Sequence, residues 1–185
     1  MPQSRKNGPS PVKMIVGLLH PSADETILEW SRAALESAFG MVERESGRFP
    51  FGYTDYYRNI APDLERTFFS FAGLRRPDEL VSWKLASVSL EAESAADEAG
   101  KKKRRVNIDP GYLDGARLIL ASTKDNAHRI YIADGIYAEV TLCRRRTGWE
   151  RFSYTFPDFR SGAYDEFFEL VRQDWRRDIK NERKE

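Results

Sequence analysis

The sequence predicts an α+β fold, in which a split βαββαβ core is extended by an antiparallel β-hairpin and a C-terminal helix. A nearly continuous apolar run at residues 12–19 is typical of a central strand covered on both faces. Residues 24–39 and 77–92 carry apolar side chains at helical spacing, and strand patterns follow each of them. Alternating apolar residues at 130–142, around an Asp-Gly pair, predict the hairpin.

Length and composition bound the class of protein. The 185 residues fit one domain at 12–180, between a disordered tail at 1–11 and a frayed end at 181–185. A hydrophobic fraction of 41% is that of a packed globular protein, and a net charge of +1 argues against a duplex-binding surface. No apolar stretch approaches the length of a membrane span. The single Cys143 cannot form an intrachain disulfide, and with no signal peptide in the sequence we expect a cytoplasmic protein.

Capping residues and breakers define the first half of the core. Ser22 and Asp24 offer N-cap groups for a helix through Phe39, and Gly40 is a natural stop. The next predicted segments are a strand at 41–46, an ordered aromatic loop at 48–57 and a strand at 65–71.

The second half begins at Pro77, which suits the first turn of a helix. This helix should end before Gly100, and the basic run to Arg105 is interpreted as a solvated loop facing the acidic helix end. A strand at 105–109 then completes the order of the ferredoxin-like split unit. The apolar residues that hold helical spacing through this element are Leu80, Val81, Leu85, Val88 and Ala92.

Beyond the core, a further strand is predicted at 116–122, followed by the hairpin and an aromatic loop at 149–160. Apolar residues at helical spacing then predict a final helix that packs on the sheet or on the other helices. These residues are Phe167, Phe168, Val171, Trp175 and Ile179.

The register of the hairpin can be derived from its two faces. A two-residue Asp-Gly turn would place Ile130 opposite Glu139 and mix apolar with ionic side chains. A three-residue turn with Gly135 left-handed pairs Ile132 with Ile136 and separates the faces, so we expect that turn. The apolar face would hold Ile130, Ile132, Ile136, Ala138, Val140 and Leu142, and the polar face Arg129, Tyr131, Tyr137, Glu139 and Thr141.

The polar face of the hairpin has two interpretations. With Arg129 across from Glu139 and Tyr131 across from Tyr137, it is either a half-exposed surface with a solvated ion pair or a ligand surface. In the second case Arg129 binds an anion and Glu139 orients it or acts as a base. The alternating polar residues of 105–109 would extend this face if the strands are neighbours.

Two turns would form the rim of such a site. Residues 109–112, Asp-Pro-Gly-Tyr, form a turn by composition. Residues 123–128 bring Lys, Asp and His into one connection, although a lone histidine is more often structural than catalytic.

These residues define the candidate site. The predicted catalytic residues are His128, Glu139 and Asp109, and the predicted ligand-binding residues are Arg129, Lys124, Asp125, Tyr112, Tyr137 and Tyr57. No metal site is predicted. Metal binding stays an alternative, in which Asp109, His128 and Glu139 would converge with Asp55. The glycine-rich phosphate-binding motifs and the G-x-S-x-G hydrolase motif are absent, and no cofactor is indicated.

Six segments resemble the signature blocks of the bacterial family called domain of unknown function 4416. They are FPFGYTDYY, LERTFFSF, RRVNIDPGYL, ASTKDNAHRIYI, GIYAEVTL and YTFPDFRS, and the resemblance extends over residues 12–171. It implies a stand-alone bacterial protein and no particular activity. The resemblance places Thr54, Tyr56, Tyr57, Asp109, Tyr112, Lys124, Asp125, His128, Arg129, Tyr137 and Glu139 in the matched blocks.

The leading expectation is binding of a small anionic ligand, a nucleotide or phosphorylated metabolite, with acid–base chemistry through His128 or a carboxylate. A non-catalytic RNA-binding module is the alternative, because basic residues gather at 101–105 and 144–146. A protein-interaction adaptor that uses the aromatic loops is the third. No oligomeric state is predicted.

Overall fold

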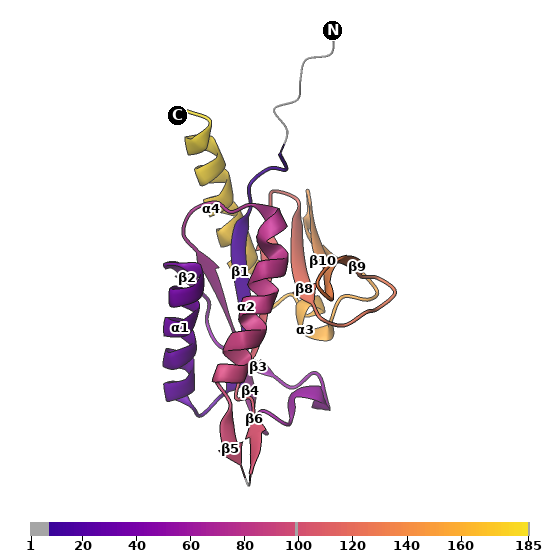
Figure 1. Ribbon diagram of the computed structural model, residues 1–185. Coiled ribbons are helices and arrows are strands. Elements are labelled where there is room, and N and C mark those ends of the chain that lie inside the picture. Colours follow the sequence, from indigo (N-terminus) through magenta and orange to yellow (C-terminus); the bar gives the residue numbers. More distant parts are fainter. Residues whose placement is uncertain (1–7, 99, 185) are drawn as a thin grey trace.

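Two sheets account for the strands of residues 8–98 and 100–184, which the computed structural model describes. Their bounds are β1 Lys13–Pro21, β2 Val42–Glu45, β3 Phe49–Phe51, β4 Leu64–Phe71, β5 Ala96–Glu98, β6 Lys101–Lys103, β7 Asn107–Leu113, β8 Arg117–Ser122, β9 Ile130–Ala133, β10 Ile136–Arg145 and β11 Gly148–Arg151. The large antiparallel sheet has the order β11-β10-β8-β7-β1-β4-β2, with β3 on β4 and β9 on β10. Strands β5 and β6 pair with each other in a separate hairpin (Figure 1).

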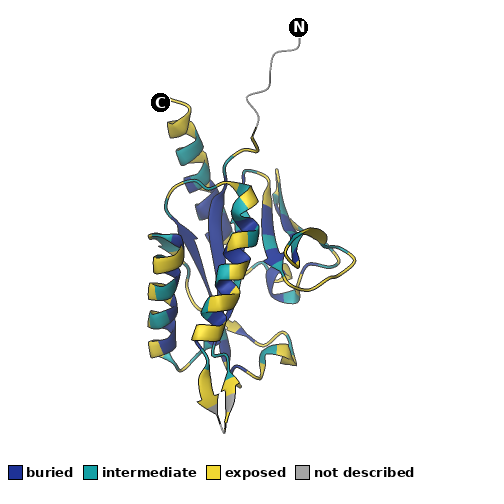
Figure 2. Ribbon diagram, viewed as in Figure 1, coloured by how far each residue is buried: buried dark blue, intermediate teal, exposed yellow. Residues whose placement is uncertain are grey.

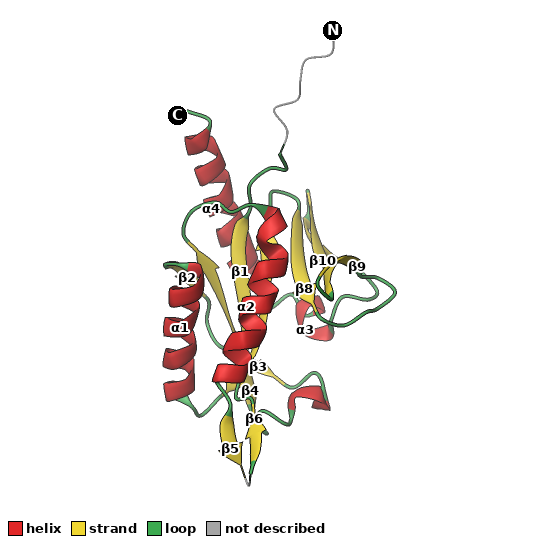
Figure 3. Ribbon diagram, in the orientation of Figure 1, coloured by secondary structure: helices red, strands yellow, loops and turns green. Residues whose placement is uncertain are grey.

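Helices cover both faces of the large sheet (Figures 1 and 3). They are α1 Glu25–Phe39, α2 Leu80–Glu93, α3 Pro157–Arg160 and α4 Asp165–Glu182, with short 3-10 helices η1 Asp55–Tyr57 and η2 Pro77–Glu79. One buried cluster joins α1 and α2 to the sheet, and another joins α3 and α4 to its opposite face. The strands between these layers are the most buried part of the chain (Figure 2).

Strand β1 has apolar contacts on both faces, as the run at residues 12–19 predicts. Met14, Val16 and Leu18 lie in the cluster with α1 and α2, whereas Ile15 lies in the cluster with α4. The predicted capping of α1 is also confirmed, because Asp24 accepts a hydrogen bond from the backbone N–H of Ile27 at 3.1 Å. The α+β class is therefore confirmed, with α1 joining β1 to β2 and α2 joining β4 to β7.

The apolar residues at helical spacing in α2 are buried only in part: Leu80 is buried and Val81 packs against the core. Leu85 and Val88 are more than 40% exposed, and the helix buries Lys84 and Glu91 instead. These two side chains bond to the backbone of Ile108 in β7: Lys84 Nζ donates to its carbonyl at 2.8 Å, and Glu91 Oε1 accepts from its N–H at 2.8 Å. Two buried polar bonds set the rotation of the helix, and apolar spacing does not reveal them.

The interpretation of residues 109–112 as a turn is also wrong, because they lie within β7. Pairs between β7 and β8 end at Gly111, although β1 pairs with β7 on both sides of Pro110. Backbone groups of alternate strand residues point to the same side, so Pro110 and Ile108 both face β8. Pro110 has no N–H to donate, and the backbone groups of Ile108 are bonded to α2. The sheet therefore opens between β7 and β8.

Gly111 is the residue of β7 at which the pairing with β8 ends, opposite Leu120. A Cβ atom there would lie 2.1 Å from the carbonyl oxygen of Ile119, which is backbone and cannot rotate away. We expect Gly111→Ala to lower the free energy of unfolding by about 2 kcal/mol, since overpacking costs about 1–3 kcal/mol. Gly47→Ala, where a Cβ meets nothing within 4 Å, is the matched control for urea unfolding. Equal midpoints for the two variants would contradict the close approach.

The hairpin has a two-residue turn, so the predicted three-residue turn is wrong. Asp134 and Gly135 have φ of 51° and 74°, and Ala133 pairs with Ile136, as in a type I′ turn. An irregularity then shifts the register, so the predicted pair Tyr131–Tyr137 is present, although Ile136 pairs with Ala133 and not with Ile132.

The predicted faces of the hairpin are wrong in part. On β9, Ile130 is 70% exposed and Ile132 is 43% exposed, whereas Glu139 and Thr141 of the predicted polar face are buried. A second irregularity at residues 140–142 of β10 places Val140 and Leu142 in clusters on opposite faces of the sheet. Strand β8 separates β7 from β10, so residues 105–109 do not extend the hairpin face directly.

Three further predictions concern the connection at 101–105, the aromatic segment at 149–160 and the two ends of the chain. Residues 101–103 are strand β6 rather than a loop, and Lys102 lies across from Asp97 as the charge pattern suggests. The aromatic segment 149–160 contains β11 and α3. Of the predicted tail and frayed end, residues 1–7 and 185 lie outside the described residues, and α4 extends to Glu182.

Candidate functional site

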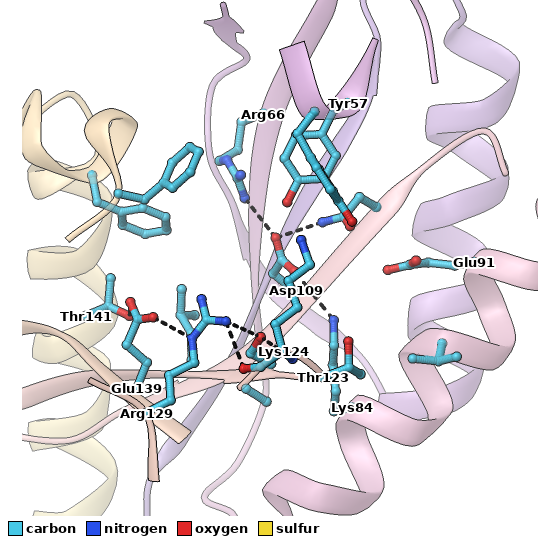
Figure 4. A pocket seen from close by; sticks show the side chains of 18 of the residues that line it. Tyr57, Arg66, Lys84, Glu91, Asp109, Thr123, Lys124, Arg129, Glu139 and Thr141 are labelled. Atoms are coloured by element: carbon cyan, nitrogen blue, oxygen red, sulfur yellow. Dashed lines mark hydrogen bonds and ion pairs between the residues drawn. The ribbon is translucent and has the colours of Figure 1, made fainter. Parts of the chain in front are cut away.

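A cavity of about 180 Å³ lies where β7 and β8 no longer pair (Figure 4). Its charged lining consists of the cations Arg66, Lys84, Arg104, Lys124 and Arg129 and the carboxylates Glu91, Asp109 and Glu139. Its neutral polar lining includes Asn107, Ser122, Thr123 and Thr141, and its aromatic lining is Tyr56, Tyr57, Phe156 and Phe159. Five cations against three carboxylates leave this lining with an excess of two positive charges.

Asp109 lies between Arg66 and Lys84 (Figure 4). Its Oδ2 accepts from Asn107 Nδ2 at 2.8 Å and lies 3.6 Å from Arg66 Nη1, and its Oδ1 lies 3.5 Å from Lys84 Nζ. Burial alone would raise the pKa of Asp109, but Lys84, Arg66 and the Asn107 amide outweigh it and hold this pKa below its ordinary value. Asp109 is therefore an ionised acceptor at neutral pH.

Arg66 extends from β4 toward Asp109 and is 3% exposed. Gly17 on β1 leaves space for it, because a Cβ there would lie 2.9 Å from Arg66 Nη1. The Nε atom lies 3.0 Å from Asp158 Oδ2, yet neither Nε nor Nη1 makes a hydrogen bond within the described residues. A buried N–H group without an acceptor is costly. Nε is close to Asp158, so Nη1, on the side of Asp109, is the unused donor that Arg66 presents beside the cavity. Rings of Phe51, Phe68 and Phe159 surround its guanidinium, with centroids at 5.2–5.8 Å.

Asp158 lies behind Arg66 and is fully buried. Its Oδ2 accepts from the Tyr164 hydroxyl at 3.1 Å, and its Oδ1 accepts from the backbone N–H of Phe159 at 2.9 Å. Burial raises the pKa of Asp158 above its ordinary value, although Arg66 acts in the opposite direction. Arg66 is thus placed between a buried carboxyl and the cavity carboxylate Asp109.

The other end of the cavity is formed by Arg129 and Glu139 (Figure 4). Arg129 Nε donates to Glu139 Oε2 at 2.9 Å, so the predicted contact between these residues is present. Arg129 Nη1 also donates to Ser122 Oγ at 2.8 Å and to the Lys124 carbonyl at 3.0 Å. His128 Nε2 lies 3.1 Å from the same Glu139 oxygen, and its ring stacks on Tyr154 at 4.5 Å.

Lys124, in the connection after β8, meets Tyr56 of η1 at the cavity. Lys124 Nζ lies 3.6 Å from the centroid of the Tyr56 ring, and Lys124 lowers the pKa of Tyr56 by hydrogen bonding and charge. Within the described part of the chain, no carboxylate forms an ion pair with Lys124. The charge of Lys124 is therefore available to a ligand.

The structure brings together five of the nine residues selected from the sequence: Asp109, Glu139, Arg129, Lys124 and Tyr57 line the cavity. His128 contacts Glu139 but does not line the cavity, and the other three predicted residues lie elsewhere. Asp125 is exposed, Tyr137 packs on Tyr131, and Tyr112 packs against the cluster that holds α1 and α2.

Sequence reasoning missed Arg66, Lys84, Glu91 and Arg104 as lining residues. A signal was present for the first two, because Arg66 interrupts the strand LERTFFSF and Lys84 interrupts an apolar helix. A lone cation in an apolar element indicates a buried charge with a specific partner.

Two features are absent from residues 8–98 and 100–184. No group of three or more His, Cys, Asp or Glu side chains is placed to hold a metal ion, so Asp109, His128, Glu139 and Asp55 do not converge. No helix in this part of the chain is both long and apolar enough to cross a membrane.

The fold and the cavity define an α+β protein whose antiparallel sheet opens around a charged pocket. The chain belongs to the family described as Domain of unknown function (DUF4416), whose model matches residues 10–175. Comparison with curated proteins gave no match, and neither did comparison with solved structures.

Proposed function

We propose that the cavity between β7 and β8 binds a small anionic ligand such as a phosphorylated metabolite. The observation that carries the proposal is Arg66, a nearly fully buried guanidinium whose Nη1, on the side of Asp109, makes no hydrogen bond in the described chain. Lys124 adds a charge that forms no ion pair with a carboxylate of the residues the structure describes, and its Nζ lies over the Tyr56 ring. An anion entering the cavity would accept from Arg66 and be attracted by Lys124.

The size of the cavity restricts the ligand. Its volume of about 180 Å³ is below the roughly 300–1,000 Å³ of pockets that enclose drug-sized ligands. A small metabolite, or the phosphate end of a nucleotide, is therefore the enclosed group. Acid–base chemistry there stays part of the proposal, with Asp109 as the candidate base. Asp109 lines the cavity whereas His128 does not, and Glu139 is already within hydrogen-bonding distance of both Arg129 and His128.

The alternative of an RNA-binding module is less well supported than a small ligand. Its basic residues are engaged with carboxylates: Arg105 pairs with Asp24, Arg144 with Glu169 and Arg145 with Glu150. Paired cations release fewer counterions from RNA and contribute little to binding.

Thermal-shift measurements with inorganic phosphate and phosphorylated metabolites test the proposal. A ligand that binds only the folded state raises Tm, and the shift grows with the ratio of ligand concentration to Kd. We expect Lys124→Ala to weaken binding about fivefold, since an exposed charge contact contributes up to about 1 kcal/mol. Lys180→Ala, an exposed lysine of α4, is the matched control. The proposal fails if no compound shifts Tm, or if both variants respond as the wild type does.

We also propose that β1, α1, β2, β4, α2 and β7 form a ferredoxin-like unit. The antiparallel order β7-β1-β4-β2, with a helix in each crossover, supports it. A bacterial, cytoplasmic location remains an expectation from the sequence.

A further inference from the structure

If the proposed function holds, the hydrogen-bond donors and acceptors of the cavity determine which polar groups the ligand must carry in addition to its negative charge. Asp109 has about four lone-pair positions for hydrogen bonds. Asn107 fills one at 2.8 Å, whereas the contacts to Lys84 and Arg66 are long, at 3.5 and 3.6 Å. Lys84 makes its short bond to Ile108 instead. Asp109 therefore keeps acceptor capacity toward the cavity and requires a donor from the ligand.

Arg66 has the opposite requirement at a neighbouring position. Its Nη1 lies 3.6 Å from Asp109 Oδ2 and has no hydrogen-bond acceptor within the described chain. A bare anion would satisfy Arg66 and leave Asp109 facing a like charge. A ligand that carries an acceptor and a donor on nearby atoms would satisfy both.

The charges around Asp109 select the kind of donor. Arg66 and Lys84 flank this single carboxylate, so an ammonium group would meet two cations and one anion. A hydroxyl donates without that repulsion. Phe156 and Phe159 line the same cavity and offer an apolar surface to a carbon skeleton.

We infer that the ligand is a hydroxylated anion, a phosphorylated or carboxylated polyol or sugar, whose hydroxyl donates to Asp109 while its anionic group accepts from Arg66. The phosphate and carboxylate forms share this chemistry. Binding is therefore decided by the hydroxyl as well as by the charge.

Two matched pairs of compounds test the inference by calorimetry on the whole chain. Glycerol 3-phosphate is compared with propyl phosphate, and glycerate with propanoate, so each pair differs in hydroxyl groups and the two pairs differ in the anion. We expect the hydroxylated member of at least one pair to bind about tenfold more tightly, since a hydrogen bond to a charged group contributes about 1.5–3 kcal/mol. Asp109→Asn should reduce that preference to less than about threefold and leave the affinity for propyl phosphate the same or higher.

The outcomes separate the two proposals. If propyl phosphate or inorganic phosphate binds and neither pair shows a preference, the inference is wrong and anion binding stands. A preference that survives in Asp109→Asn also overturns it. If none of these anions binds, the proposed function fails together with the inference. The pairs are measured first on the wild-type chain, so a missing preference there does not depend on how well the variant folds.

Discussion

Arg66→Leu is expected to destabilise the fold by about 4 kcal/mol at pH 8, because removing one partner of a buried ion pair costs about 3–5 kcal/mol. The variant leaves Asp158, which is fully buried, without its cation. It also removes a charge beside Asp109. Urea unfolding measures the loss, with Arg58→Leu as the control, since Arg58 pairs with Asp55 on the surface and the expected change is below about 1 kcal/mol.

The loss should depend on pH in a defined direction. Burial already raises the pKa of Asp158, and without Arg66 that pKa rises further. A carboxyl with a raised pKa favours the folded state below its unfolded pKa of about 3.9, and this stability is lost as pH rises through the folded value. The difference between Arg66→Leu and the wild type should therefore be smaller at pH 5 than at pH 8. A loss that is independent of pH, or larger at pH 5, would contradict this account.

Lys13→Met is expected to lower the free energy of unfolding by about 3 kcal/mol. Lys13 is fully buried in β1, and its Nζ lies 2.5 Å from Glu43 and 2.6 Å from Asp178. The substitution keeps the volume and removes the charge, so two carboxylates of β2 and α4 lose their shared cation. Arg177 also contacts both of them, which limits the loss to the lower part of the range.

Chemical denaturation of Lys13→Met is best compared with that of two other variants. Lys180→Met makes the same change at an exposed position of α4 and should cost less than about 0.5 kcal/mol. Adding Glu43→Gln and Asp178→Asn to Lys13→Met should recover part of the lost stability, because no unpaired charge remains. A single variant as stable as Lys180→Met would show that the buried lysine is dispensable.

Much of the element order follows from local features of the sequence. The apolar run of β1, the Asp24 cap of α1 and the stop at Gly40 act within a few residues of themselves. The contact between Arg129 and Glu139 was also predictable, because both flank one hairpin and alternation alone brings them together.

The opening in the sheet depends on partners far away in the chain. Asp-Pro-Gly-Tyr has the composition of a turn, and it continues as a strand because it pairs with β1. The edge of β7 that faces away from β1 is bonded at Ile108 to Lys84 and Glu91, 17 or more residues earlier. The same holds for Arg66, whose partner Asp158 lies near the other end of the chain. The error in the hairpin has a local cause. Its turn has two residues and not three, and an irregularity between Ile136 and Tyr137 compensates for the difference, so the predicted Tyr131–Tyr137 pair is still present.

The arrangement around Ile108 and Pro110 has a consequence for engineering. Two features keep β7 and β8 apart: Pro110 has no backbone N–H to donate, and Lys84 and Glu91 of α2 bond to the backbone of Ile108. Neither feature involves the side chains of β8 or β10 that face the gap. Thr123, which follows β8 and is exposed at the cavity, can therefore be exchanged without closing the sheet, whereas Ser122 accepts a hydrogen bond from Arg129 and Thr141 is buried. Lys84 and Glu91 both hold this space open and line it, so they are the two side chains to keep in any redesign of the cavity.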